Sequence, residues 1–85
     1  MVEIKRIAYS EKFERDVKKV RDSLLKERVK DQVRKIAESP EVGKPLQYGL
    51  KGERTVRISP YRLIYAVQGD TLVLPRFEHR KNVYD

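Results

Sequence analysis

The sequence predicts a two-layer α+β domain in which an N-terminal strand and a helical hairpin precede an antiparallel three-strand meander. Apolar residues recur at helical spacing through residues 11–38 and alternate with polar residues from residue 56 onward. A loop rich in Pro and Gly separates these two stretches. The chain has 85 residues, enough for one small domain, which we expect to span residues 1–85. The amphipathic helix pair is expected to pack on one face of the sheet.

The first strand is predicted over residues 2–9, where apolar and charged residues alternate with an irregularity near Arg6. Ser10 is the predicted N-cap of the first helix, because its hydroxyl can accept a hydrogen bond from a free backbone amide. Glu11 and Glu14 follow in the first turn, where negative charge suits the helix dipole. The apolar face of this helix is predicted from residues at steps of four, three and four: Phe13, Val17, Val20 and Leu24.

The apolar pattern then changes phase, which favours a second helix over one long helix. Asp22 and Ser23 are both good capping residues, so we expect the chain to turn there. The second helix is predicted to end near Glu38, because Pro40 disfavours helical conformation in the residue before it. Its apolar face is predicted from Leu25, Val29, Val33 and Ile36.

The meander is predicted from three apolar stretches and the two turns between them. The turns are Ser59–Pro60 and residues 68–70. Pro75 lacks an amide hydrogen, so it is expected at a sheet edge or in a bulge. The three apolar stretches are residues 56–58, 61–67 and 72–74.

The composition favours an anionic partner and excludes several classes of site. Lys and Arg number 20 against 13 Asp and Glu, which gives a net charge of +7. The chain has no Cys and one His, so disulfides, thiolate sites and His-rich metal sites are excluded, and no metal or cofactor is expected. It has no apolar run of the ~20 residues that span a bilayer and no secretory signal, so we expect a cytoplasmic protein without a membrane partner.

Strand alternation predicts a basic concavity on the sheet face that the helices leave open. If the apolar residues of the meander face the core, Arg57 and Arg62 point to the opposite side. The C-terminal segment, with His79, Arg80 and Tyr84, is expected to fold over that face. Arg grips phosphate oxygens through a planar fork, while His and Tyr can stack on bases and carry protons. The alternative is that these residues are only solvated charges on a sheet.

Carboxylates are scarce in the second half of the chain, which argues against metal-dependent cleavage of nucleic acid. Residues 43–85 contain only four: Glu53, Asp70, Glu78 and Asp85. A two-metal nuclease needs several clustered carboxylates. If the chain cleaves nucleic acid, the natural route is attack of an RNA 2′-hydroxyl on the adjacent phosphate. DNA lacks that nucleophile, so this route implies RNA.

Several short motifs, taken together, resemble the RelE/ParE toxin superfamily, and its RelE branch most closely. The motifs are Leu50-Lys51-Gly52, Val56-Arg57-Ile58, Tyr61-Arg62-Leu63-Ile64-Tyr65 and His79-Arg80-Lys81-Asn82-Val83-Tyr84. The resemblance implies the toxin of a type II toxin–antitoxin pair. It further implies a ribosome-dependent mRNA endonuclease that cleaves mRNA in the A site and inhibits translation.

The resemblance also implies roles for individual residues. Arg62 stands at the family's Tyr-Arg position and Arg57 at a basic strand position, both associated with the scissile phosphate. Arg80 matches the basic position after the last strand and Tyr84 the aromatic near the C-terminus. His79 stands where relatives have His or Lys. We expect further contacts with RNA from Lys44, Lys51, Arg54 and Lys81.

The sequence departs from the family pattern at two positions near this site. Thr55 stands where some relatives have a basic residue, and Glu78 stands where Gly is common.

The expected partners are a RelB-like antitoxin, the ribosome with its mRNA, and operator DNA only through the antitoxin complex. Two alternatives stay open: a ParE-like gyrase inhibitor without nuclease chemistry, and a catalytically weak antitoxin-binding module.

Overall fold

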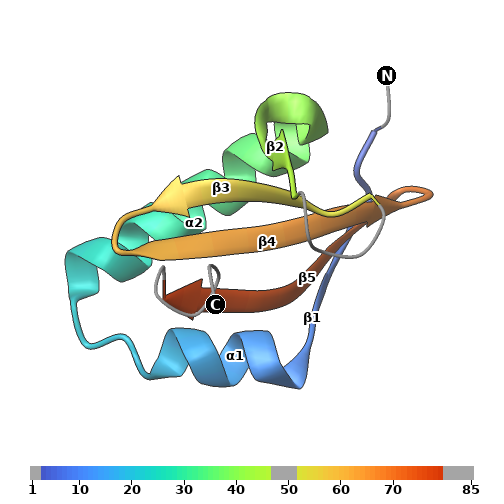
Figure 1. The fold of residues 1–85 in the computed structure, drawn as a ribbon. Helices are drawn as coiled ribbons and strands as arrows, with labels where there is room; N and C mark the ends of the chain where they lie inside the picture. Colours follow the sequence, from blue (N-terminus) through green and yellow to red (C-terminus); the bar gives the residue numbers. More distant parts are fainter. Residues whose placement is uncertain (1–2, 47–51, 80–85) are drawn as a thin grey trace.

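A computed structural model of the protein describes residues 3–46 and 52–79. The described chain forms a mixed sheet with two helices, in the order predicted from the sequence (Figure 1). The two helices are α1 (Glu11–Lys18) and α2 (Ser23–Glu38), and a short 3₁₀ helix, η1, covers Pro40–Val42. The strands are β1 (Arg6–Tyr9), β2 (Lys44–Pro45), β3 (Arg54–Ile58), β4 (Tyr61–Gln68) and β5 (Thr71–His79).

The sheet has the strand order β1-β5-β4-β3-β2, with β1 parallel to β5 and the remaining pairs antiparallel. The predicted meander is therefore confirmed, and β2 adds a short strand from the loop after α2. Figure 1 shows α2 behind β3 and β4, while α1 runs alongside β5. The predicted α+β architecture with helices on one side of the sheet is confirmed.

The N-terminal strand is shorter than predicted, because it begins at Arg6 rather than at residue 2. Arg6 is the register partner of Thr71, the first residue of β5. Before that point β5 offers no partner, so Lys5 donates its amide to the carbonyl of Asp70 in the turn instead. Ile4 still packs against the core.

Both predicted helix caps are present. The Ser10 Oγ accepts a hydrogen bond from the amide of Phe13 at 2.9 Å and donates one to the carbonyl of Pro75. The Asp22 Oδ1 accepts from the amides of Leu24 and Leu25, at 2.9 and 3.3 Å. These bonds satisfy amides that a helix start leaves without intrahelical partners.

The core lies between α2, α1 and the sheet. The second predicted apolar face is buried as a whole, from Leu25 to Ile36. The first predicted apolar face is wrong at Leu24, because this side chain is 75% exposed. The chain leaves α1 after Lys18 and turns before α2 begins, so the spacing that runs from Phe13 to Val20 does not continue into Leu24.

A β-bulge in β5 reverses which residues face the helices. Ile64 pairs with Arg76, but Ala66 pairs with Val73, so β5 holds one residue more than β4 between these two pairs. Pro75 lies in this irregularity, as expected of a residue without an amide hydrogen. Leu72 and Leu74 are buried before the bulge, and Phe77 is buried after it.

None of the helices in the described residues is long and apolar enough to cross a membrane.

Candidate active site

Arg57 and Arg62 are direct register partners across β3 and β4. Their neighbours along each strand, Ile58 and Leu63, are fully buried in the core, so alternation turns both guanidinium groups to the opposite face of the sheet. Arg57 is exposed and Arg62 is half-buried. The predicted placement of these two residues on one open face is confirmed.

The two arginines line a pocket of about 340 Å³ on this face. Lys44 joins them, because β2 pairs Lys44 with Thr55 at the edge of the sheet. Among the described residues, the lining contains three cationic side chains and no carboxylate; these residues are Val42, Gly43, Lys44, Thr55, Val56, Arg57 and Arg62. The Thr55 hydroxyl is buried and has no hydrogen-bond partner within residues 3–46 and 52–79. We refer to this surface as the basic pocket.

A buried tyrosine holds one wall of the basic pocket in place. The Tyr65 hydroxyl accepts a hydrogen bond from the amide of Gly43 at 2.9 Å and donates one to the carbonyl of Pro40. Burial raises the pKa of Tyr65 above 10.0, the amide of Gly43 and the charge of Arg54 oppose that rise, and Glu41 adds to it. The hydroxyl therefore stays protonated and can donate.

Only glycine fits at position 43. A Cβ there would lie 2.7 Å from the Tyr65 hydroxyl oxygen and 2.9 Å from the carbonyl oxygen of Thr55. The backbone can approach Tyr65 this closely because Gly43 has no side chain. This contact places Lys44, the next residue, at the mouth of the basic pocket.

Arg54, for which the sequence predicts a contact with RNA, lies on the face of β3 opposite to Arg57. It pairs with Tyr65 across β3 and β4, and its Nη1 donates to the carbonyl of Gly43 at 2.7 Å. Arg54 does not line the basic pocket. The RNA contact predicted for Arg54 stays untested, while its contact with Gly43 supports the pocket wall.

His79 does not join the two arginines, contrary to the expected concavity. It is the register partner of Tyr61, and the two rings meet edge to face with centroids 5.3 Å apart. Tyr61 also stacks on Phe77, which is buried under α1. His79 instead lines a second pocket of about 380 Å³, together with Lys12, Asp16, Lys19, Tyr61, Phe77 and Glu78.

The bulge at Pro75 is the physical reason why His79 faces the helices while Arg76 and Glu78 face the other side of the sheet. Strict alternation from Leu74 would turn Arg76 and Glu78 toward the core. The extra residue turns them to the other side, so Glu78 becomes the register partner of Arg62, and Arg76 that of Ile64.

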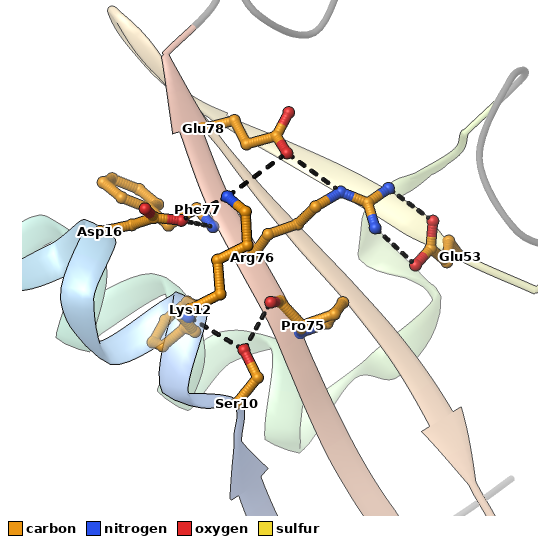
Figure 2. A network of polar contacts seen from close by, with 9 residues as sticks. Ser10, Lys12, Asp16, Glu53, Pro75, Arg76, Phe77 and Glu78 are labelled. Carbon is orange, nitrogen blue, oxygen red and sulfur yellow. Dashed lines mark hydrogen bonds and ion pairs between the residues drawn. The ribbon is translucent and has the colours of Figure 1, made fainter.

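A polar network links this face to α1 (Figure 2). Arg76 donates two hydrogen bonds to the carboxylate of Glu53, at 2.8 and 3.2 Å, and its Nε lies 3.3 Å from Glu78 Oε1. Lys12 reaches the same oxygen of Glu78 at 3.8 Å and Asp16 at 3.1 Å. Sequence reasoning did not single out Arg76, because no local pattern shows that a residue after Leu74 changes face.

Four of the predicted site residues lie outside the described part of the chain. They are Lys51, Arg80, Lys81 and Tyr84. The structure therefore brings together Arg57, Arg62 and Lys44 among the predicted residues, and separates His79 and Arg54 from them. Three cations around one pocket suit an anionic ligand with several oxygens, such as a phosphate group.

Comparison with known proteins assigns the chain to a family. A search of curated protein sequences finds no match. The RelBE2 toxin–antitoxin complex from Mycobacterium tuberculosis contains a chain with 29% identity and a TM-score of 0.72, over 88% of this chain and 96% of that chain. The RelB–RelE antitoxin–toxin complex from Methanococcus jannaschii contains one with 25% identity and a TM-score of 0.72, over 92% and 95% of the two chains.

A further structure supports the fold alone. The YoeB/ParE toxin from Agrobacterium tumefaciens has a TM-score of 0.79 at 20% identity, over 88% of this chain and 98% of that chain.

The family model described as "ParE toxin of type II toxin-antitoxin system, parDE" matches residues 7–84, which is most of the sequence. The chain therefore belongs to the ParE toxin family of type II toxin–antitoxin systems, within the RelE/ParE superfamily that its motifs resemble.

Proposed function

We propose that this toxin is a metal-independent endoribonuclease of the RelE type, which cleaves mRNA in the ribosomal A site and so inhibits translation in the cytoplasm. The observation that supports this most is the cross-strand pair of Arg57 and Arg62 in the basic pocket. Their mutual repulsion is relieved when an anion binds between them.

In the proposed reaction, the 2′-oxygen of the RNA attacks the adjacent phosphorus and the bond to the 5′-oxygen breaks. The products are a 2′,3′-cyclic phosphate and a 5′-hydroxyl end. One proton leaves the 2′-hydroxyl and one is gained by the departing 5′-oxygen, so no cofactor is consumed. Arg57 and Arg62 neutralise the charge that develops on the phosphate oxygens, and Lys44 orients the flanking backbone.

The proton transfers need groups on the same face of the sheet as the phosphate. His79 faces the helices, so the proposal assigns these transfers to Tyr84, with Arg80 as a third phosphate contact. Both residues lie outside the described chain. A positive charge beside a Tyr lowers its pKa and makes it a better base.

The expected protein partner is an antitoxin of the RelB type, because the two relatives from Mycobacterium tuberculosis and Methanococcus jannaschii are complexes with such proteins. An antitoxin that covers the basic pocket would block RNA. Operator DNA is expected to bind only through the antitoxin complex.

The test is cleavage of an mRNA in a programmed ribosome, compared with the same RNA alone. We expect cleavage at the A site only in the ribosomal sample, with a 5′-hydroxyl end, because the ribosome positions the message for a sparse site. Arg62→Ala should abolish most of it. Arg28→Ala removes the same charge from the exposed side of α2 and should change nothing. Unchanged cleavage by the Arg62 variant contradicts the proposal.

Inhibition of DNA gyrase is the second candidate, favoured by the match to the ParE model. A supercoiling assay with purified gyrase separates the two. Inhibited supercoiling together with intact ribosome-bound mRNA would replace the nuclease proposal with this one. An inactive, antitoxin-binding chain would give neither effect while still binding its partner.

A further inference from the structure

We propose that the backbone N–H and C=O groups of Arg57 bind the Watson–Crick edge of the nucleobase next to the phosphate that the basic pocket holds. The inference deepens the proposed function and rests on it for the nature of the ligand. Arg57 then contributes to the site twice, with its guanidinium group toward the phosphate and with its backbone toward the base.

The direction of the Arg57 backbone follows from a hydrogen bond at the edge of the sheet. Leu46 donates its amide to the carbonyl of Glu53 at 2.9 Å, so the backbone groups of Glu53 face the β2 side and not β4. In a regular antiparallel strand, backbone groups point to the same side at every second residue. The register of β3 against β4 has no irregularity, so the backbone groups of Arg57 also face the β2 side.

The short strand β2 ends before it reaches Arg57. It pairs with β3 only through Lys44 and Pro45, and β3 continues past it toward the turn into β4 (Figure 1). Because Lys44 lies opposite Thr55, the next pair of the same kind would be Val42 and Arg57. This pair is missing from the ladder.

The chain before β2 is held away from β3 by other contacts. Val42 belongs to η1 and donates its amide within that turn, at 3.1 Å. Both backbone groups of Gly43 are bound to side chains, the amide to Tyr65 and the carbonyl to Arg54. In the described part of the chain, no group pairs with the backbone N–H or C=O of Arg57.

One donor and one acceptor side by side suit the edge of a nucleobase. Every RNA base carries an adjacent acceptor and donor on its Watson–Crick edge, and proteins bind single-stranded RNA through these edges. Arg57 lines the basic pocket together with Val42, whose side chain is 53% exposed and offers an apolar surface to the flat face of a base. A base and its phosphate therefore find complementary groups in one pocket.

A peptide strand fits this edge less well. Strand addition uses a row of unpaired backbone groups. Here β3 ends at Ile58 and the chain then turns, so Arg57 is the last residue of β3 that faces outward. The three cations of the pocket also favour a ligand that brings a phosphate.

The experiment follows the NMR signal of the Arg57 amide in ¹⁵N-labelled protein during titration with AMP. Ribose 5-phosphate, which has the sugar and the phosphate but no base, is the matched ligand. We expect AMP to shift the Arg57 amide signal and ribose 5-phosphate to leave it unchanged. Equal shifts with the two ligands, or no shift with AMP, overturn the proposal. A shift caused only by the extended acidic peptide Val-Asp-Val-Asp overturns it as well, because the edge would then serve a protein strand.

A backbone substitution isolates the donor from the side chain. An ester oxygen in place of the Arg57 N–H, introduced by chemical synthesis of the chain, keeps the guanidinium group. AMP should then bind roughly three- to tenfold more weakly, the effect of one hydrogen bond, while binding of ribose 5-phosphate should not change. The matched control is the same ester at Val56, whose N–H faces β4: it should lower stability and keep the preference for AMP. Unchanged AMP affinity in the Arg57 ester contradicts the proposal.

Failure of this inference and failure of the proposed function give different results. A protein whose Arg57 amide responds to AMP, but which leaves ribosome-bound mRNA intact, refutes the nuclease and supports the base site. A protein that cleaves the mRNA without any response of the Arg57 amide to AMP refutes the base site alone. Should an ester chain fail to fold, the titration of the unmodified protein still decides between these results.

Discussion

Arg57 and Arg62 occupy opposite positions on two antiparallel strands, and both point away from the core. Like charges directly opposite each other destabilise a sheet. An anion bound between the two guanidinium groups would offset this cost.

Replacing either arginine should reduce RNA cleavage far more than it reduces stability. We expect Arg57→Ala and Arg62→Ala each to slow cleavage of ribosome-bound mRNA by roughly 10²–10³-fold, because each removes a preorganised charge. Melting temperatures should change much less than the rates, since neither guanidinium group is part of the core. Rates of all variants should be measured with Arg28→Ala alongside, and a fall in both rate and melting temperature would point to misfolding instead.

His79→Gln should have a much weaker effect than Arg62→Ala. His79 contacts Tyr61 on the helix side of the sheet and lines the pocket next to α1. We expect the rate of cleavage to fall by less than about tenfold, which is less than about 1.4 kcal/mol in activation free energy. A loss as large as that of Arg62→Ala would restore the proton-carrying role predicted from the sequence.

Gly43→Ala should destabilise the protein, because the new methyl group would meet the Tyr65 hydroxyl at 2.7 Å. Overpacking of this kind costs about 1–3 kcal/mol in the free energy of unfolding. Tyr65→Phe should cost a similar amount, since it leaves the amide of Gly43 and the carbonyl of Pro40 without their shared partner. Denaturant unfolding of the double variant should give a loss smaller than the sum, because Phe removes the hydroxyl oxygen that the methyl group meets, although the ring carbon Cε1 at 2.8 Å and the Thr55 carbonyl oxygen at 2.9 Å remain. Additive losses would contradict the contact.

The stability of the protein should depend on Tyr65 at high pH. Burial raises the pKa of Tyr65 above its value of 10.0 in the unfolded chain. The unfolded state therefore loses this proton first, so the contribution of Tyr65 is complete below pH 10 and falls as the pH rises through the folded-state pKa. Between pH 9 and 11, the melting temperature of wild type should fall more steeply than that of Tyr65→Phe; parallel curves would contradict this.

Ser10→Ala should lower stability by about 1–2 kcal/mol. The Ser10 hydroxyl both caps α1 and binds the carbonyl of Pro75 in the bulge of β5. Ser23→Ala is the matched control, since Ser23 is exposed at the first turn of α2, where Asp22 provides the cap. Equal losses for the two variants, measured by chemical unfolding, would show that neither the cap nor the link to Pro75 contributes to stability.

Local chemistry explains why much of the fold could be predicted from the sequence. Ser10 and Asp22 are capping residues, and their effect depends only on the two or three residues that follow. The apolar spacing from Leu25 to Ile36 describes one helical face and is buried as a whole. Alternation within β3 and β4 also sufficed to place Arg57 and Arg62 together, because both strands are regular from Arg54 to Ile64.

Two errors came from extending a local pattern across a break in it. Leu24 fits the spacing of α1, but the chain turns before α2 begins, and Leu24 is exposed. The first strand is shorter than predicted, because its length depends on where β5 begins. Its first residue, Arg6, pairs with Thr71, which lies 65 residues further along the chain.

By itself, the sequence determined the order of elements, the helix caps, the buried face of α2 and the pairing of two arginines on the open face. Only the tertiary structure decided which residues of the last strand join them. The one-residue bulge at Pro75 turns Arg76 and Glu78 toward Arg62 and turns His79 toward Tyr61. A bulge is a mismatch between two strands, so it is defined by their pairing and not by the sequence of either strand alone.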